Sequence, residues 1–522
     1  MIKPSRNRTI IVRTKKEGVL MDKKVIVIGS GVAGAGIGAL LAHEGYNVKL
    51  FEKNNRIGGR FSSERVDGWT LDVGCHLIAN CEKGTIGEIL KICEEPSDKI
   101  KWRYAHKPSP KFFYNGQFVK FPQDISKFNL PPSAFGGLMQ LYQDVMKLKP
   151  NEIEELNYTS ITDFVGNYTT DPKVRAMMAY FCGLYFVTDQ ETSAGEWIYC
   201  QQELMKNRSS GYPIGGTIAV PSSYCDIIEK YDGEVHTDTP IEKIIIKDDR
   251  AIGVKLEDGR SIESDLVISN AGIKTTVLKL IGAEHFQTEF VEKVENYQFS
   301  LATLMVKIAL DEKITDENMI MFLSFEEMIK EAKKMNIIPG GDAMSDEEFI
   351  GNITLDLISK AAQSPEFKGY VPSKHFAIFI PIVSNLDPTA APEGKQLIFA
   401  GSGAPDSHEE ELNYDKWAES VMAGVRDVFP DIDDHILWTK ITTPQDIDSF
   451  AGKFGNVIGI GQTINQVGEN RPPQELPGIE NVYECSADTG LHGIGGELAA
   501  DSALRLYSKL TGKEIELFSN RK

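Results

Sequence analysis

Cysteine is scarce in this chain and shows no pattern typical of disulfides or metal sites. The 522 residues include seven cysteines, an odd number, at positions 75, 81, 93, 182, 200, 225 and 485. None of them forms a CxxC pair, and their density is far below that of a disulfide-stabilised secreted domain. The sequence therefore predicts no bound metal ion, no disulfide framework and a reducing, cytoplasmic location.

Long apolar runs and excess positive charge are also missing. No stretch of eighteen or more apolar residues occurs, which predicts no transmembrane helix and restricts any membrane contact to the periphery of the bilayer. The formal net charge of -19 argues against broad attraction to nucleic acid or acidic lipid, and no nucleic-acid motif is present. Residues 1–21 are basic but lack the apolar core of a signal peptide, so we expect a disordered leader.

What the chain does contain is a glycine loop in the setting that a dinucleotide requires. Val25 to Ile28 has the β-branched character of a buried parallel strand, and it leads into Gly29-Ser30-Gly31-Val32-Ala33-Gly34. A helix is predicted from Ala35 to Glu44, and a second strand from Asn47 to Phe51. An isolated loop of this kind is as often a plain glycine-rich turn, but here strand, loop, helix and strand follow in order.

An acidic residue completes this unit. Glu52 ends the second strand, where a carboxylate can accept hydrogen bonds from the ribose hydroxyls of the adenosine half. The order predicts a Rossmann unit that binds NAD or FAD. The residues expected to contact the dinucleotide are Gly29, Gly31, Ala33, Gly34, Glu52 and Lys53.

A second glycine motif separates FAD from NAD. Arg56-Ile57-Gly58-Gly59-Arg60 follows the second strand, and Leu71-Asp72-Val73-Gly74-Cys75-His76 comes next. This region resembles the flavoprotein group of amine oxidases, protoporphyrinogen oxidases and phytoene desaturases. The resemblance implies non-covalently bound FAD, with Gly58, Gly59, Arg60 and Gly74 along its pyrophosphate and flavin side. Without the family, GGR indicates only a flexible basic turn.

The C-terminal region resembles the closing FAD motif of the same group. The segment from Glu484 to Asp488 precedes a glycine-rich stretch and a helix predicted from Glu497 to Leu510. By resemblance, Asp488 would bind the ribityl hydroxyls or the pyrophosphate, and the amides of Gly495, Gly496 and Leu498 would face the flavin. The resemblance also places a backbone contact to adenine at Ile241, in a β-meander predicted between His236 and Gly272.

The middle of the chain completes the fold prediction. The Tyr212-Pro213-Ile214-Gly215-Gly216 segment and the DPxxAPEGK turn from Asp387 resemble phytoene desaturases and retinol saturases. We expect an α/β fold with a Rossmann-type FAD-binding domain made of residues 22–100, 211–289 and 461–522. Residues 101–210 and 290–460 would form a twice-inserted α+β substrate domain of mixed sheet and helices. The apolar run from Met177 to Phe186 fits either a substrate tunnel or ordinary core.

Flavin-dependent catalysis does not require an obvious catalytic acid or base in the sequence, because the cofactor itself exchanges the hydride. His76 and His492 lie in segments expected beside the flavin ring, and either could move a proton near neutral pH or be structural. Cys485 is expected to be a small buried side chain. Four further charged residues could line the site or form surface salt bridges: Arg471, Glu475, Glu497 and Asp501.

The sequence thus predicts an FAD-dependent oxidoreductase that desaturates, saturates or isomerises carbon-carbon double bonds of a hydrophobic polyene or isoprenoid. Its partners would be that small molecule and an unidentified electron donor or acceptor. One alternative is a flavin amine oxidase for more polar substrates, disfavoured by the absence of an aromatic-cage motif. Another is an escort or dissociation-inhibitor protein for prenylated partners. The intact cofactor motif residues disfavour this alternative: Glu52, Gly58 to Arg60 and Asp488.

Overall fold

The computed structural model describes most of the chain. It covers residues 23–74, 76–105, 110–120, 123–128, 130–171, 173–175, 177–178, 185–338, 341–345, 349, 370–405 and 413–515. The predicted basic leader, Cys75 and residues 179–184 of the apolar run lie outside the described residues. Of that run, Met177, Met178 and Tyr185 are buried in a hydrophobic cluster.

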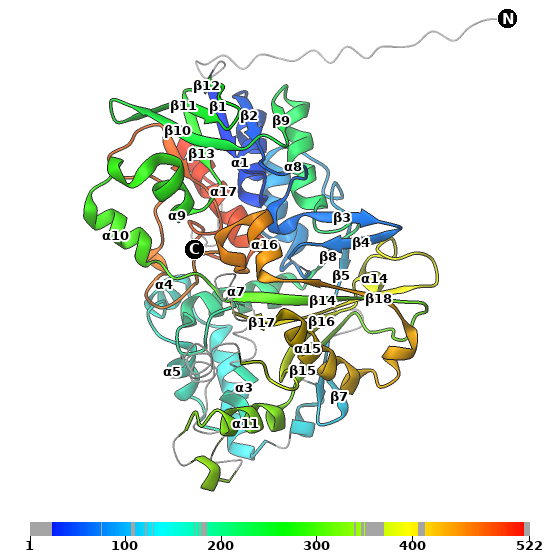
Figure 1. The fold of residues 1–522 in the computed structure, drawn as a ribbon. Coiled ribbons are helices and arrows are strands. Elements are labelled where there is room, and N and C mark those ends of the chain that lie inside the picture. The colour runs from blue at the N-terminus through cyan, green and yellow to red at the C-terminus, as the bar shows by residue number, and fades with distance from the viewer. Residues whose placement is uncertain are drawn as a thin grey trace, which may run out of the picture.

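A five-stranded parallel sheet forms the upper part of the molecule in Figure 1. Its strand order is β19 (Val482–Glu484), β13 (Leu266–Ser269), β1 (Lys24–Ile28), β2 (Asn47–Phe51) and β9 (Glu234–His236), and every neighbouring pair is parallel. β1 is buried on both faces, as its continuous β-branched run predicts. The predicted α/β fold with a Rossmann-type sheet is confirmed.

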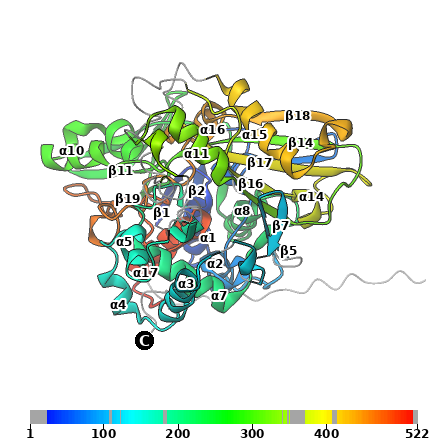
Figure 2. The ribbon, with the colours of Figure 1, turned by 90° about the horizontal axis from the view of Figure 1, so that it is seen from below.

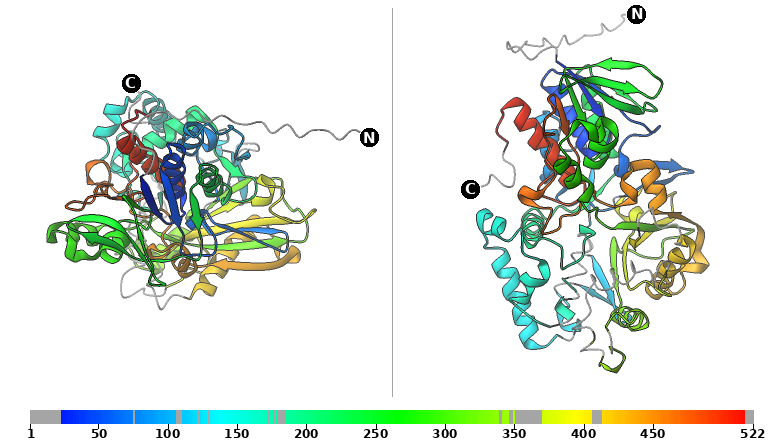
Figure 3. Two further views of the ribbon diagram at one scale, coloured as in Figure 1. Left: turned by 90° about the horizontal axis from the view of Figure 1, so that it is seen from above. Right: turned by 60° about the vertical axis from the view of Figure 1, so that its left-hand side comes forward.

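Helices cover one face of this sheet, and a second sheet covers the other. Val25 and Val27 pack in one cluster with α1 (Val32–His43), α8 (Ala219–Lys230) and α17 (Gly496–Thr511). Ile26 and Ile28 pack in another cluster with the antiparallel sheet β10 (Ile241–Lys247), β11 (Arg250–Leu256) and β12 (Ser261–Glu263). Figure 3 shows β10 and β11 in green and α17 in red on opposite sides of the blue strands.

The predicted β-meander is therefore divided between two sheets. Its first two strands pair as expected, but the third, β13, joins the parallel sheet beside β1. Strand β12 was not predicted, because Ser261–Glu263 offers one apolar side chain between two polar ones. Helix α1 begins at Val32, three residues before the predicted start, because Gly31 already serves as its N-cap.

A seven-stranded sheet lies below the parallel sheet. Its order is β18 (Ile436–Thr442), β14 (Ala302–Leu310), β17 (Gln396–Ala404), β16 (Ala377–Pro381), β15 (Met319–Leu323), β6 (Lys111–Tyr114) and β7 (Gln117–Lys120). Only the contact between β6 and β15 is parallel. This contact joins two parts of the chain that are separated by the whole segment from 115 to 318. Helix α15 (Tyr414–Val428) packs against the sheet.

Several helices form a third group beside this sheet. They are α3 (Pro132–Val145), α4 (Pro150–Glu155), α5 (Ile161–Gly166), α7 (Ala194–Asn207) and α11 (Phe325–Lys334). Seen from below in Figure 2, α3, α4, α5 and α7 lie together, away from β14 and β18. Buried apolar residues of these helices form one cluster with strands β6 and β15. Within the described residues, no helix is long and apolar enough to span a membrane.

Shorter elements connect these layers. They are β3 (Ser63–Val66), β4 (Trp69–Asp72), β5 (Trp102–Tyr104), β8 (Gly211–Pro213), α2 (Thr85–Ile92), α9 (Ile273–Thr275), α10 (Thr288–Asn296), α14 (Val383–Leu386) and α16 (Pro444–Ala451). A π-helix from Thr276 to Gly282 extends α9.

Candidate cofactor-binding site

Neighbouring backbone and side-chain atoms pack closely against the glycine loop. A Cβ atom at Gly34 would lie 2.1 Å from the carbonyl oxygen of Gly29, and one at Gly31 would lie 2.6 Å from the side-chain amide of Asn270. No side chain caps α1, so the N–H groups of its first turn, including that of buried Ala33, have no capping partner. An uncapped helix start beside glycine is the arrangement that receives a phosphate.

Asn270, at the end of β13, supports this loop. In the orientation that satisfies both ends of its amide, Nδ2 donates to the carbonyl of Cys485 at 3.0 Å and Oδ1 accepts from the Gly31 N–H at 3.1 Å. Sequence reasoning did not assign Asn270 a role, although it stands in the Ser269-Asn270-Ala271-Gly272 segment where the meander was predicted to end.

Glu52 connects the glycine loop to the GGR segment. It is buried at the end of β2, and its Oε2 accepts hydrogen bonds from the N–H (3.0 Å) and Oγ (2.6 Å) of Ser30. Its Oε1 accepts from the N–H (3.0 Å) and Nδ2 (2.9 Å) of Asn54. The Ser30 Oγ in turn accepts from the Gly58 N–H at 2.9 Å. Protein donors thus fix both carboxylate oxygens.

Two other predicted adenosine contacts lie close to Glu52. The carbonyl of Glu52 accepts a hydrogen bond from the N–H of Thr239 at 2.9 Å. Strand β10 begins two residues later, at Ile241, and therefore starts near Glu52. Lys53 is exposed and its Nζ donates to the carbonyl of Ser449 in α16 at 3.1 Å.

The GGR segment runs along the glycine loop. A Cβ at Gly59 would lie 3.8 Å from Cα of Gly31 and would meet no other atom within 4 Å, so there is open space beside this residue. Gly74 packs on Arg60, because its Cβ would lie 3.1 Å from the Arg60 carbonyl oxygen. Two adjoining glycine segments with free space at their contact fit a dinucleotide backbone.

Arg60 points into the protein. Its Nε donates to the carbonyl of Asn456 at 2.8 Å, and its Nη2 donates to Oδ1 of Asn456 at 3.1 Å. Burial lowers the pKa of Arg60 to about 10, while Asp488 and Asp448 act in the opposite direction. The guanidinium therefore remains charged at neutral pH and contributes a buried positive charge.

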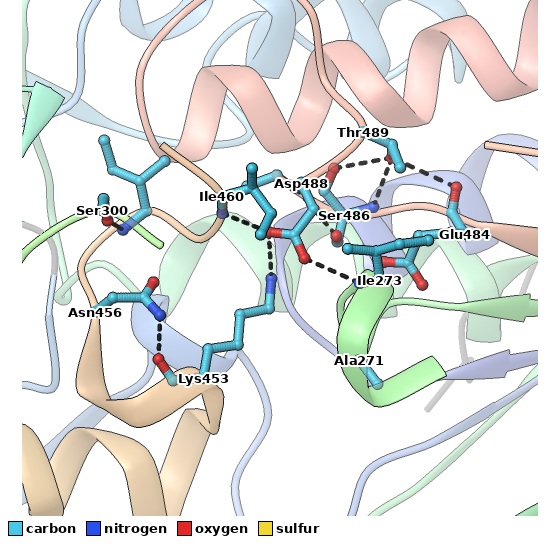
Figure 4. Close-up of polar contacts among 12 residues, drawn as sticks. Ala271, Ile273, Ser300, Lys453, Asn456, Ile460, Glu484, Ser486, Asp488 and Thr489 are labelled. Carbon is cyan, nitrogen blue, oxygen red and sulfur yellow. Dashed lines mark hydrogen bonds and ion pairs between the residues drawn. The ribbon is translucent and has the colours of Figure 1, made fainter. Parts of the chain in front are cut away.

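Asp488 is the centre of a fully buried hydrogen-bond network (Figure 4). Its Oδ1 accepts from Nζ of Lys453 and from the N–H of Ile460, both at 2.9 Å, and its Oδ2 accepts from the N–H of Ile273 at 3.0 Å. Burial acts to raise the pKa of Asp488, but Lys453 and the two backbone N–H groups outweigh it and hold the pKa below its usual value.

Lys453 reaches Asp488 from a strained turn that follows α16. Gly452, Lys453, Phe454 and Gly455 all have positive φ, of 73°, 64°, 58° and 75°. The left-handed conformation costs about 1–2 kcal/mol at each of the two non-glycine residues. Sequence reasoning did not identify Lys453, and the glycines on both sides of Lys453-Phe454 were the only available signal.

The glycine-rich stretch of residues 490–496, here called the closing glycine motif, packs against the GGR segment. Gly496 begins α17, and a Cβ there would lie 2.3 Å from the ring of Phe61. Gly495 is the N-cap, has no side-chain cap, and has open space where its Cβ would be. Leu498 is buried in the helix core. The first-turn amides of α17 thus lie beside residues 58–61.

Arg471 holds this motif in place from inside the protein. Its guanidinium donates to the carbonyls of Gly490 (3.0 Å), Ala487 (2.8 Å), Ile460 (3.0 Å) and Gly461 (3.0 Å). Surface salt bridges therefore do not account for Arg471, nor for Glu497 and Asp501, which are also buried. Glu475 does form such a bridge, with Lys509 at 2.7 Å. Cys485 is fully buried, as predicted.

His492 is hydrogen-bonded to a buried carboxylate. Its Nδ1 lies 3.1 Å from Oε1 of Glu196 in α7, and its ring packs on Tyr199 with centroids 4.5 Å apart. The other oxygen of Glu196 accepts from Nε2 of Gln462 at 3.3 Å. Burial lowers the pKa of His492, but Glu196 outweighs burial and raises it above the ordinary value.

His76 lies in a different buried cluster. Its ring meets Phe399 of β17 edge-on at 4.7 Å, and its Nδ1 lies 3.5 Å from Oδ2 of Asp72. Nζ of Lys307, in β14, donates to the carbonyl of Asp72 at 2.5 Å, and burial lowers the pKa of this lysine to about 8. Lys307 was also missed, although a single lysine within the apolar Ala302–Leu310 strand is a visible signal.

The chain is similar to known flavoproteins over nearly its whole length. Residues 37–338, more than half of the chain, match the family of flavin-containing amine oxidoreductases. A 4,4'-diapophytoene desaturase (4,4'-diapolycopene-forming) from Methylomonas sp is 22% identical, over 94% of this chain and 96% of that protein. A 4,4'-diapophytoene desaturase (4,4'-diaponeurosporene-forming) from Staphylococcus aureus strain Newman is 24% identical, over 94% and 99%.

A solved structure has the same fold. An oxidoreductase from Methanosarcina mazei superposes with a TM-score of 0.67 at 18% identity, covering 92% of this chain and 99% of that one. The resemblance to phytoene desaturases and the prediction of FAD are confirmed by these comparisons. The chain therefore belongs to the flavin-containing amine oxidoreductase family and is an FAD-dependent oxidoreductase.

Proposed function

We propose that this protein desaturates carbon-carbon bonds of a hydrophobic isoprenoid polyene. The observation that carries this proposal is the full-length similarity to two 4,4'-diapophytoene desaturases, which includes the segments outside the Rossmann unit. Both of these relatives introduce double bonds, which favours desaturation over saturation or isomerisation. FAD supplies the chemistry when bound, because its N5 position accepts a hydride from carbon.

In this proposal, one part of the molecule binds FAD and the other binds the substrate. The parallel sheet and its covering layers, from residues 22–100, 211–289 and 461–522, would bind FAD. Residues 101–210 and 290–460 would bind the substrate, and the pairing of β6 with β15 supports treating them as one unit. The names of the two desaturase relatives support a substrate without charges.

The FAD contacts follow the geometry of the glycine segments. The helix starts at α1 and α17 would face the diphosphate and the flavin, and Arg60 would supply positive charge between them. Glu52 would contact the ribose and Ile241 the adenine. Asp488, whose carboxylate already accepts three hydrogen bonds from the protein, would act chiefly by fixing Lys453 and the backbone at Ile460 and Ile273.

The test is product formation by the purified, FAD-loaded protein. We expect it to convert 4,4'-diapophytoene, supplied in detergent with a quinone as electron acceptor, into a product with a longer conjugated system. The same preparation should release no hydrogen peroxide with putrescine. Peroxide release with the amine and no change of the polyene would contradict the proposal, and a purified protein without flavin would support a binding role instead.

A further inference from the structure

A pocket lies on the far side of the closing glycine motif. It is lined by the start of α2, the middle of α7 and the start of α17. His492 and Gly493 form part of its wall, together with Asn80, Glu203 and Glu497. The backbone of residues 493–496 therefore has this pocket on one side and the GGR segment, at Phe61, on the other.

One residue that lines the pocket, Glu497, is a buried ionisable group. This carboxyl is 6% exposed, and its Oε2 accepts from Nδ2 of Asn80 at 3.2 Å. Its Oε1 lies against Gly84, where a Cβ atom would come within 2.2 Å. Burial raises the pKa of Glu497 to about 8.

A hydrogen-bonded path leads inward from the pocket through His492. Glu196 binds His492 with one oxygen and the amide of Gln462 with the other, at 3.1 and 3.3 Å. Gln462 is 1% exposed, and its Oε1 has no hydrogen-bond partner among the described residues. It stands two residues after Ile460, whose N–H binds Asp488. The hydrogen-bonded path thus ends at Gln462, two residues along the chain from the Asp488 network.

We propose that His492, held by Glu196, takes up one proton through this pocket each time the bound FAD is reduced by two electrons. This inference deepens the proposed function and rests on the placement of FAD between the GGR segment and the closing motif. Reduction adds two electrons and one proton to the cofactor, and the second proton resides on the imidazole. Oxidation of the cofactor returns that proton to the pocket.

The physical basis is the negative charge that reduction adds to a cofactor bound beside the closing motif, to which His492 belongs. A cation near the reduced cofactor becomes more favourable, so the pKa of His492 is higher in the reduced than in the oxidised protein. The titratable and charged groups that act on His492 or line the same pocket are Glu196, Tyr199, Cys200 and Glu203 on α7, Glu497, Asp501 and Arg505 on α17, Glu88 on α2, and Lys83 just before α2. Among these, Glu497 is the competing proton acceptor.

The midpoint potential of the flavin as a function of pH tests this inference. A two-electron couple changes by about 30 mV per pH unit for each proton taken up. The wild-type protein should show about 60 mV per pH unit in a window that begins above the ordinary pKa of histidine, and about 30 mV on either side of it. Dithionite reduces the protein in this titration, so that no organic substrate is required.

Three variants identify the residue that takes up the second proton. His492→Asn should show about 30 mV per pH unit throughout while retaining FAD. Glu196→Gln, which keeps the imidazole, should move the start of the steep window to lower pH by at least one unit. Glu497→Gln should keep the steep window.

Three outcomes would overturn the inference: a wild-type slope near 30 mV at every pH, an unchanged curve in both His492→Asn and Glu196→Gln, or loss of the window in Glu497→Gln alone. Glu196→Gln alone decides the matter if His492→Asn fails to fold. Conversion of 4,4'-diapophytoene by the wild type is measured separately, so a failure of the proposed function is distinguishable from a failure of proton uptake.

Discussion

The ammonium of Lys453 lies 2.9 Å from Oδ1 of Asp488, and the two side chains are 6% and 0% exposed. Lys453 belongs to a left-handed turn after α16, whereas Asp488 precedes the closing glycine motif. The pair thereby ties a part of the chain assigned to the substrate side to the glycine segments of the proposed FAD site.

Removing this lysine should be costly. Lys453→Met leaves the Asp488 carboxylate buried without its cation, and breaking a buried pair in this way costs about 3–5 kcal/mol of the free energy of unfolding. Denaturant unfolding measures the loss. Lys509→Met is the matched control, because it breaks an exposed pair with Glu475 and should cost at most about 1 kcal/mol. Equal losses in the two variants would contradict a structural role for the buried pair.

The glycine loop should not accept even one methyl group. Gly34→Ala places a Cβ 2.1 Å from the Gly29 carbonyl, so the loop must shift and FAD affinity should fall at least tenfold, or by about 1.4 kcal/mol. Flavin fluorescence on dilution gives the dissociation constant. Gly136→Ala in α3, where a Cβ meets no atom within 4 Å, should leave FAD binding unchanged. An unchanged affinity in Gly34→Ala would show that the loop does not hold the cofactor.

Glu52 should matter through its charge and its four hydrogen bonds. Glu52→Gln replaces one acceptor oxygen with an NH₂ group that faces the donors of Ser30 or Asn54. A hydrogen bond to a charged group is worth about 1.5–3 kcal/mol, so weakening the one that the ribose would donate to Glu52 should lower FAD affinity roughly 10- to 100-fold. Isothermal titration of the apoprotein with FAD measures this change, and an affinity equal to that of the wild type would argue against the ribose contact.

Glu484 should make the protein less stable at neutral and higher pH than at acidic pH. Burial raises its pKa to about 7, and its Oε2 accepts a hydrogen bond from Oγ1 of Thr276 at 2.6 Å. Because a raised carboxyl pKa means that the folded state holds the proton more tightly, stability falls as the pH rises from about 4.5 to 7. Glu484→Gln should remove this fall and stabilise the protein at pH 8 by about 2–3 kcal/mol. Thermal unfolding across this pH range checks the prediction, which fails if the variant and the wild type show parallel curves.

The sequence was informative wherever one short segment determines the structure. β2 spans the predicted Asn47–Phe51, because its alternation and the following Glu52 are local signals. The site is different, because its contacts join distant segments. Arg60 binds Asn456 across 396 positions, and His492 meets Glu196 across 296. No periodicity or spacing reports such pairs, so Lys453, Asn456 and Glu196 could not be predicted.

A single-turnover experiment without oxygen tests the central claim most directly. The FAD-loaded protein is mixed with an equimolar amount of 4,4'-diapophytoene in detergent, and the absorbance of the oxidised flavin is followed together with that of the polyene. Desaturation predicts that the flavin absorbance falls as absorbance from a longer conjugated system appears, in equal amounts and at the same rate. Flavin that stays oxidised with the polyene but is reduced by putrescine would contradict the account and identify an amine oxidase.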